Sequence, residues 1–365
     1  MPDVGIDVQL ESLISAACVS TKAFAALFLQ ERFYRPFASL TEEIFQAIDD
    51  TTKQKVCIAA PRGWGKSSVN LIANPARNIL FGHKKFIVPI SSTATKAEME
   101  TENLKRELTT NQLIAEIFGD VKTSSWSKEQ FIAKDTFVLP RGAGQQVRGI
   151  NYNGARPDLI IIDDLEDSES VRSEEQRLKL KEWFYGDVCN SVDRGRDDWK
   201  IIFVGTILHE DALLANLLKD PSWCTIKLQI CDENLKSNWP EYMSDEQVRQ
   251  LYEEYKAQGQ ADVFAREYRN IAISLEDAVF KHTFFKYYEP SEILDNHNLV
   301  YCTLVDPAKT TSLHSADSAV VTVAVDLDSH KIYVHDVTAG KMYPDELFDA
   351  IFEHVAQHGS RLLGV

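Results

Sequence analysis

The chain has 365 residues, of which 44% are hydrophobic and 26% are charged, and its formal net charge is −16. This length predicts two domains that each bury a core, and the composition is that of an ordinary globular protein. The acidic charge argues against a uniformly basic protein that coats nucleic acid, although a local basic groove is compatible with it. Six cysteines without a C-x-x-C pair indicate reduced cytosolic thiols.

Residues 1–51 predict a helical segment that packs on the domain after it. Apolar side chains recur at helical spacing through Leu13–Leu29 and again over Leu40–Ile48. A lysine interrupts the first stretch and acidic residues precede it, so it predicts neither a signal peptide nor a membrane-spanning helix. Tyr34 and Arg35 are candidates for contacts with adenine, or for plain core positions.

A glycine-bearing turn follows, between a predicted buried strand at Val56–Ala60 and a predicted helix at Val69–Leu80. Strand, glycine loop and helix form a phosphate cradle, because backbone N–H groups and the helix N-terminus point at the anion. The candidate phosphate-binding residues are Ala60, Pro61, Arg62, Gly63, Trp64, Gly65, Lys66, Ser67 and Ser68. Lys66 would reach the β- and γ-phosphates of ATP, and the Ser67 hydroxyl would bind Mg²⁺. Ala60 stands where the usual motif has its first glycine.

The next elements are a strand at Phe86–Ser91 and one long amphipathic helix at Thr95–Phe118. Pro89 lacks a backbone N–H, so we expect the strand at an edge of the sheet.

The apolar run Leu159–Ile162 predicts a strand that is buried on both faces, and several carboxylates follow it. The carboxyl ends of strands are where α/β sheets bind ligands. Asp163 would hold Mg²⁺, and a nearby carboxylate would position and polarise the attacking water. Asp164 and Glu166 are both candidates for this role, and we prefer Asp164 because it adjoins the metal carboxylate.

Lys200–Gly205 predicts another buried strand, and Thr206 at its end would sense the γ-phosphate or belong to a plain turn. Thr225–Ile230 predicts one more strand. Strands that alternate with helices predict an α/β fold with a mostly parallel sheet, here a P-loop NTPase domain over residues 52–231. Residues 232–297 predict a helical linker.

Residues 298–365 predict the start of a second domain. Its predicted strands and helix are, in order, Leu299–Val305, Asp317–Asp326, Lys331–Val337, the helix Pro344–His358, and a strand that begins at Leu362. An RNase H-like nuclease begins with this order of elements.

Together these motifs resemble those of the large terminase subunit of tailed bacteriophages, the motor that packages viral DNA. The matching segments are Pro61–Ser67, Val147–Gly149, Ile160–Asp164, Val204–Thr206, Ala265–Asn270 and Val305–Ala308. The resemblance covers nearly the whole chain, and the arginine inside the phosphate loop, Arg62, is a feature of this family. It implies a packaging ATPase that uses ATP and Mg²⁺, joined to an endonuclease that uses Mg²⁺ or Mn²⁺ to cut concatemeric DNA.

The resemblance also implies roles for single residues. Asp163 maps onto the carboxylate that binds magnesium, and Asp164 maps onto the catalytic carboxylate. Relatives usually carry Glu at the position of Asp164, so Glu166 remains the alternative candidate for the catalytic carboxylate. Thr206 falls on the coupling motif. Arg148 falls where an arginine acts across a subunit interface, unless it only hydrogen-bonds its own glycine-rich loop, Arg141–Gly149.

In the implied nuclease, Asp306 maps onto the first metal-binding acid, and Asp317 is either a second candidate or a solvated residue at the start of a strand. The family places its second metal acid just past Val365 and its third still later. We therefore expect a fragment whose nuclease is incomplete and inactive.

The implied partners are double-stranded DNA, a capsid portal protein and a small terminase subunit, around a homo-oligomeric ring. The implied location is the cytoplasm of an infected bacterium, without a membrane. Two alternatives are a helicase-like nucleic-acid translocase and a non-catalytic scaffold protein with a nucleotide fold.

Overall fold

The computed structural model describes residues 4–167, 170–171, 173–271, 286–289, 298–308 and 317–364. The chain divides into two compact units, Met1–Val279 and Phe280–Val365. Residues 232–271, which the sequence predicts as part of a linker, therefore belong to the first unit.

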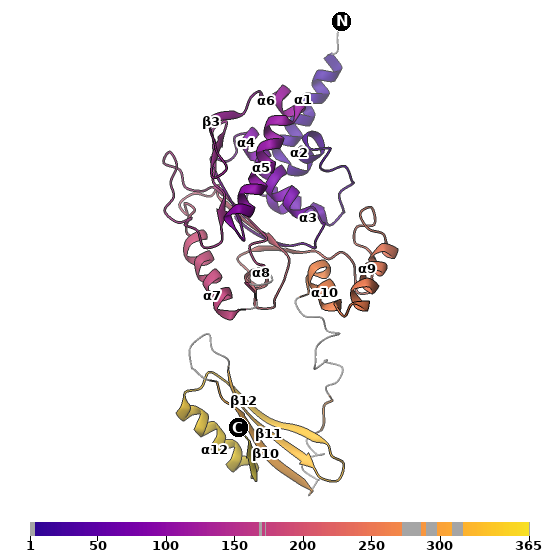
Figure 1. Cartoon of the computed structure of the whole chain (residues 1–365), viewed down its shortest axis with the longest axis vertical. Coiled ribbons are helices and arrows are strands. Elements are labelled where there is room, and N and C mark those ends of the chain that lie inside the picture. The colour runs from indigo at the N-terminus through magenta and orange to yellow at the C-terminus, as the bar shows by residue number, and fades with distance from the viewer. Residues whose placement is uncertain are drawn as a thin grey trace. The chain divides into compact units, whose positions relative to one another are not determined.

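The described part of the first unit is built on a nine-stranded, mostly parallel sheet (Figure 1). Its strand order is β3-β4-β5-β2-β7-β8-β1-β9, with β6 beside β2. The strands are β1 (Lys55–Ala59), β2 (Phe86–Ser91), β3 (Lys122–Trp126), β4 (Phe131–Ala133), β5 (Thr136–Val138), β6 (Arg141–Gly142), β7 (Leu159–Asp163), β8 (Lys200–Gly205) and β9 (Cys224–Lys227). Only the β3–β4 and β4–β5 pairs are antiparallel. The predicted α/β fold with a mostly parallel sheet is confirmed.

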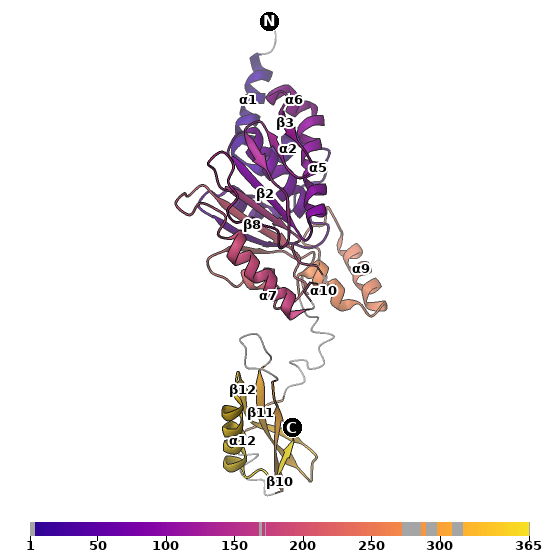
Figure 2. The same ribbon diagram turned by 60° about the vertical axis from the view of Figure 1, so that its left-hand side comes forward.

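Helices cover both faces of this sheet (Figure 2). The helices of the first unit are α1 (Val4–Val19), α2 (Thr21–Phe28), α3 (Thr41–Asp49), α4 (Asn74–Leu80), α5 (Ala94–Thr110), α6 (Gln112–Phe118), α7 (Glu174–Trp183), α8 (Leu213–Leu217), α9 (Asp245–Ala257) and α10 (Ala261–Arg269) among its described residues. A π-helical turn, η1 (Ser68–Ala73), precedes α4, and a second, η2 (Phe184–Val188), follows α7. In β1, Val56 and Ile58 join the core under the N-terminal helices, while Cys57 and Ala59 join the core under η2 and α8.

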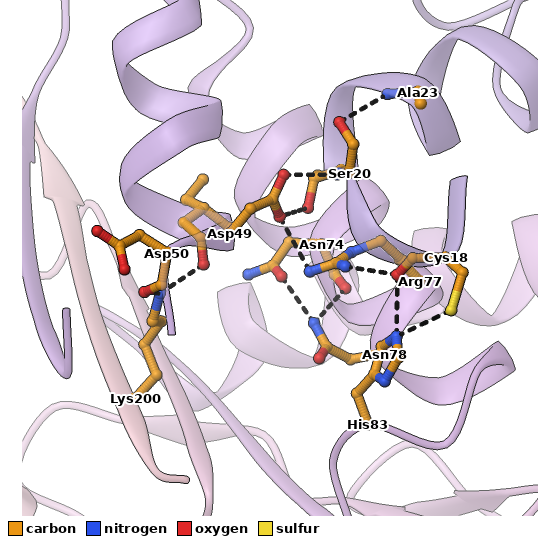
Figure 3. A network of polar contacts seen from close by, with 12 residues as sticks. Cys18, Ser20, Ala23, Asp49, Asp50, Asn74, Arg77, Asn78, His83 and Lys200 are labelled. Carbon is orange, nitrogen blue, oxygen red and sulfur yellow. Dashed lines mark hydrogen bonds and ion pairs between the residues drawn. The ribbon is translucent and has the colours of Figure 1, made fainter. Parts of the chain in front are cut away.

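A polar network fastens the N-terminal helices to this core (Figure 3). Arg77 of α4 pairs with Asp49 of α3 at 2.9 Å and donates to the carbonyl oxygen of Cys18 in α1 at 2.8 Å. Lys200, the first residue of β8, donates to the carbonyl oxygen of Asp50 at 2.8 Å, just past the end of α3. Burial lowers the pKa of Lys200 to about 8. A cation at a helix C-terminus satisfies carbonyl groups that the helix leaves unpaired.

The expectation that Pro89 marks an edge strand is wrong, because β2 lies between β7 and the strands β5 and β6. The carbonyl groups of Ile87 and Ser91 both accept hydrogen bonds on the β5 and β6 side, so the nitrogen of Pro89 faces that side too. There β5 pairs with β2 only up to Ile87, and β6 only from Ile90 onwards. The missing N–H therefore faces the interval between two short strands, where the sheet does not require it.

The long helix expected over Thr95–Phe118 is in fact two helices, because Asn111 interrupts it. Its Oδ1 accepts from the backbone N–H of Ile114 at 3.1 Å and so caps α6, while its Nδ2 donates to the carbonyl of Phe28 at 2.6 Å. Asparagine favours such caps over a helix interior.

The second unit holds its elements in the predicted order. They are β10 (Leu299–Asp306), β11 (Ser318–Asp326), β12 (Ile332–Gly340), α12 (Pro344–His358) and β13 (Leu362–Gly364). The strand order is β12-β11-β10-β13, and β13 runs parallel to β10 while the other pairs are antiparallel. Its assignment to the RNase H-like nucleases stays a prediction.

All six cysteines are free. Within the described part of the chain, none of the helices combines the length and apolar character that a bilayer crossing requires.

Candidate active site

The candidate phosphate loop joins β1 to the helical stretch that begins with η1. Gly63 and Gly65 have φ angles of +80° and +75°, a region that favours glycine. A Cβ placed on Gly63 would stand 2.2 Å from the hydroxyl of Tyr242. The side chain of Trp64 is buried against Trp239, with ring centroids 5.3 Å apart, so this residue offers the loop its backbone only.

Lys66 lies at the centre of a group of polar side chains from three neighbouring strands. Its Nζ donates to the Thr206 hydroxyl at 2.6 Å and lies 3.0 Å from Oδ1 of Asp164. The Ser67 hydroxyl donates to Oδ2 of Asp163 at 2.7 Å. Because β8 lies between β1 and β7 and all three run parallel, their carboxyl ends meet at one edge of the sheet. The structure thus brings these five predicted residues together.

Asp163 has features of a metal ligand. Its side chain is buried, and its Oδ1 has no hydrogen-bond partner among the described residues. Burial, and then the neighbouring charge of Asp164, raise the pKa of this carboxyl above its ordinary value. An unpartnered buried carboxylate oxygen needs an explanation, and a hard cation such as Mg²⁺ takes oxygen ligands of this kind. The residues present, Asp163 with the Ser67 hydroxyl beside it, fit such an ion.

The two rivals for the catalytic carboxylate have different surroundings. Both oxygens of Glu166 accept backbone N–H groups at the start of α8, from Leu213 at 2.7 Å and Leu214 at 3.0 Å, and burial raises its pKa. Asp164 is half-buried, faces Lys66 and has a left-handed backbone with φ +42°. Such strained backbone is concentrated at functional sites. Glu166 thus caps the start of α8, whereas Asp164 faces Lys66 at the cavity.

Lys66, Ser67, Asp164, Glu166 and Thr206 line a cavity of about 460 Å³. Its lining is Arg62, Gly63, Gly65, Lys66, Ser67, Ser68, Lys96, Asp164, Glu166, Asp167, Thr206, Leu208 and Glu267. Lys96, which sequence reasoning missed, lies in the first turn of α5, and its Nζ is 3.4 Å from the carbonyl oxygen of Asp164. Its position just beyond the carboxyl end of β2 could have indicated it, because α/β sheets bind ligands at the carboxyl ends of their strands.

A smaller pocket of about 170 Å³ adjoins the loop at Gly63 and Gly65. Tyr34 and Arg35, the candidates for adenine contacts, both line it. The Arg35 guanidinium lies 5.1 Å from the centre of the Tyr34 ring and 5.3 Å from that of Tyr242. An aromatic and cationic pocket of this kind suits a flat heterocycle.

Of the two predicted arginines, Arg62 lines this cavity and Arg148 does not. Arg62 is 72% exposed, and its Nε lies 3.1 Å from the carboxylate of Glu267. Arg148 is exposed and does not line the cavity of its own chain. The glycine-rich loop is instead held by Arg141, which donates to the carbonyl of Gln146 at 3.2 Å.

Helix α10 contacts the phosphate loop directly, although its residues were predicted as a linker. The backbone N–H of Arg62 donates to the carbonyl of Glu267 at 2.9 Å. Asn270 ends the helix with φ +52°, accepts from Ile207 N at 3.0 Å and donates to the carbonyl of Leu228 at 2.8 Å. The sequence signal for this helix was the segment Ala265–Asn270, which is one of the segments that resemble those of the large terminases.

In the second unit, Asp306 and Asp317 lie at the same end of the sheet, because Asp306 pairs in register with Ala319. Both are exposed, and Asp317 forms an ion pair with Lys341 at 3.1 Å. Gly364 of β13 pairs with Leu304. Val365 lies outside the described residues.

The sequence matches no protein-family model and no curated protein. The chain is similar in structure to large terminases of bacteriophages. The large terminase of bacteriophage HK97 has a TM-score of 0.47 and 14% identity, over 90% of this chain and 70% of that one. A large terminase from a thermophilic bacteriophage, in complex with ATP-gamma-S, has a TM-score of 0.39 and 10% identity, over 90% and 76%. The large terminase ATPase domain of Thermus phage P74-26 has a TM-score of 0.43 and 14% identity, over 66% and 99%. The likeness is one of fold.

Proposed function

We propose that the first unit binds ATP with Mg²⁺ and hydrolyses it. The observation that carries this proposal is the contact of Ser67 with Asp163, whose second carboxylate oxygen has no partner among the described residues. The short ion pair between Lys66 and Asp164 adds support. Mg²⁺, when bound, would neutralise negative charge on the β- and γ-phosphates.

Lys66, Asp164 and Thr206 would have separate roles in hydrolysis. Lys66 would orient the γ-phosphate, with its ammonium group held by the Thr206 hydroxyl until the nucleotide binds. Asp164 would accept a hydrogen bond from the attacking water and polarise it. Thr206 would then register the loss of the γ-phosphate through its contact with Lys66.

The test is ATP turnover by the purified Lys66→Ala variant. Removing one preorganised phosphate contact costs several kcal/mol of transition-state stabilisation, so turnover should fall at least ~100-fold. Lys53→Ala is the matched control, because Lys53 is exposed and precedes β1 at the opposite end of the strand. Unchanged turnover in Lys66→Ala would refute the site.

We further propose that this ATPase is a subunit of a viral DNA-packaging motor, a terminase that acts on double-stranded DNA. The order of the matching motifs supports this reading, including an arginine in the phosphate loop. The proposed partners are a portal protein, a small terminase subunit and further copies of the chain in a ring. Double-stranded DNA with portal-bearing procapsids should stimulate hydrolysis. Unwinding of duplexes would favour a helicase-like translocase instead, and absence of hydrolysis would favour a scaffold.

For the second unit we propose a metal-dependent nuclease. Asp306 is its first candidate ligand of Mg²⁺ or Mn²⁺, and Asp317 is the second. Their position at one end of the sheet supports it. Cleavage of double-stranded DNA in Mn²⁺ that is lost in Asp306→Ala is the result expected of a complete nuclease. Equal cleavage by the Asp306→Ala variant would refute the assignment.

A further inference from the structure

The second unit has polar side chains where its sheet meets α12. Among the described residues, the apolar core there consists of Val305, Val320 and Ile351. His354 of α12 is buried at the same interface, with Nδ1 at 2.9 Å from the Thr322 hydroxyl and Nε2 at 2.8 Å from the Thr338 hydroxyl. Buried polar groups that are satisfied in this way fix one arrangement of side chains.

A β-bulge turns two consecutive residues of β12 toward α12. Asp336 pairs with Thr322 of β11, and Val334 pairs with the next residue of that strand, so His335 is the extra residue. Asp336 lies 2.9 Å from Nε2 of His358, and the His335 ring lies 4.8 Å from the His358 ring. Bulges re-aim side chains and are frequent beside functional sites.

Asp336, His354 and His358 each present one ligand atom, and these three atoms lie within 4.8 Å of one another. The Oδ2 of Asp336 is 2.9 Å from Nε2 of His358 and 3.9 Å from Nε2 of His354. Zinc bonds of about 2.0–2.2 Å at tetrahedral angles separate ligand atoms by roughly 3.3–3.6 Å. The two distances from Asp336 lie on either side of that range, and the two histidine nitrogens lie within 4.8 Å of each other, so an ion would bind after rotation of these side chains.

We propose that Asp336, His354 and His358 bind a divalent transition-metal ion, Zn²⁺ foremost. Imidazole nitrogen suits this class of ion, whereas Mg²⁺ takes oxygen ligands. The site is therefore distinct in chemistry from the proposed magnesium sites, and it does not depend on ATP hydrolysis.

The surroundings of the histidines support metal binding. The hydrogen bond between His354 Nδ1 and Thr322 holds the ring with Nε2 toward the Thr338 hydroxyl and Asp336, and metal-bound histidines are oriented through their second ring nitrogen in this way. A bound ion would take the place of the contact between Nε2 and the Thr338 hydroxyl. The Asp336 side chain is 37% exposed, which gives an ion access from solvent. Three protein ligands leave one tetrahedral position to water.

A metal ion would also stabilise the second unit. Its described apolar core is small, and small domains with little buried apolar surface often depend on a bound metal. Binding of the ion to the folded state alone would add its free energy to folding.

The experiment is titration of the full chain with Co²⁺ and Zn²⁺. We expect one Co²⁺ per chain with the visible absorption of a tetrahedral site, displaced by Zn²⁺. Hydrogen exchange in β12 and α12 should slow on addition of Zn²⁺. All six tryptophans precede residue 240, so tryptophan fluorescence reports on the first unit and should not respond.

The variants His358→Gln and Asp336→Asn should each weaken binding at least about tenfold, as loss of supporting groups already does at metal sites. His330→Asn is the matched control, because His330 is exposed in the turn between β11 and β12. No tetrahedral spectrum from the unaltered chain would overturn the proposal, and so would binding that persists in both variants.

A variant that loses protection from hydrogen exchange even without metal has lost structure, and its weaker binding would then not test the site. In that case the imidazole ¹⁵N resonances of the unaltered chain show whether the histidines bind the ion. Zn²⁺ must then shift the Nε2 signals of His354 and His358. A change with pH but none with Zn²⁺ would mean that the cluster only exchanges protons, which also overturns the proposal.

Discussion

Exchanging Glu166 for glutamine should lower stability more than catalysis. Both oxygens of Glu166 accept backbone N–H groups of Leu213 and Leu214. Glutamine keeps one acceptor oxygen and turns an NH₂ group toward the other N–H. A hydrogen bond to a charged group contributes about 1.5–3 kcal/mol, and burial of the charge offsets part of this, so we expect a loss of about 2 kcal/mol. In a domain of this size that lowers the melting temperature by about 4–8 °C.

The companion variant Asp164→Asn should show the opposite pattern. Asparagine keeps an oxygen that can accept a hydrogen bond from Lys66, and it tolerates the left-handed backbone of this position, so the loss of stability should be small. Loss of a general base lowers turnover by about 10²–10⁴-fold. Asp164→Asn should therefore fold normally, bind ATP and hydrolyse it at least about 100-fold more slowly.

The assay pairs thermal unfolding followed by tryptophan fluorescence with phosphate release at saturating ATP, and a fluorescent ATP analogue checks that binding is retained. Glu166→Gln should keep turnover within about tenfold of the unaltered chain below its melting temperature. If Glu166→Gln abolishes hydrolysis while Asp164→Asn retains it, the assignment is wrong and the hydrogen bonds to α8 orient a catalytic group.

Further predictions concern pH, subunit contacts and the phosphate loop. The raised pKa of Asp163 means that the folded metal-free chain holds a proton more tightly than the unfolded chain. The contribution of Asp163 to stability should thus fall as pH rises from 3.8 through the raised pKa, and melting curves of Asp163→Asn should differ from those of the unaltered chain by the loss of this contribution. Mixing Arg148→Ala with Lys66→Ala subunits should restore some hydrolysis, and no recovery in assemblies shown to contain both would contradict action across an interface. Gly63→Ala should weaken ATP binding at least about tenfold, with partial recovery when Tyr242→Ala removes the clash.

The sequence predicted the centre of the candidate site because its chemistry is local. The phosphate loop, the carboxylates after β7 and the hydroxyl after β8 each follow a short apolar run. Runs buried on both faces indicate central parallel strands, whose carboxyl ends meet. Ser67 and Asp163 are therefore in contact although 96 positions separate them.

Other features depend on contacts that no local pattern encodes. Residues 232–271 are polar enough to suggest a linker, yet Trp239 packs on Trp64 and Asn270 holds two distant loops. In β12, alternation predicts that His335 and Asp336 point to opposite faces, and only the bulge turns both toward α12. A bulge is an extra residue relative to the partner strand, so the sequence of one strand alone does not reveal it.

Arg62 belongs to the local phosphate-loop motif and also contacts the distant helix α10. Its backbone N–H is already bonded to the carbonyl of Glu267, so the phosphate cradle must be built from the N–H groups that follow it in the loop. Its guanidinium is 72% exposed and pairs with Glu267 at 3.1 Å, so the arginine side chain has solvent on one side into which it can rotate. A catalytic role for Arg62 therefore requires only that the side chain leave Glu267 for a phosphate, while the backbone bond keeps α10 attached to the loop.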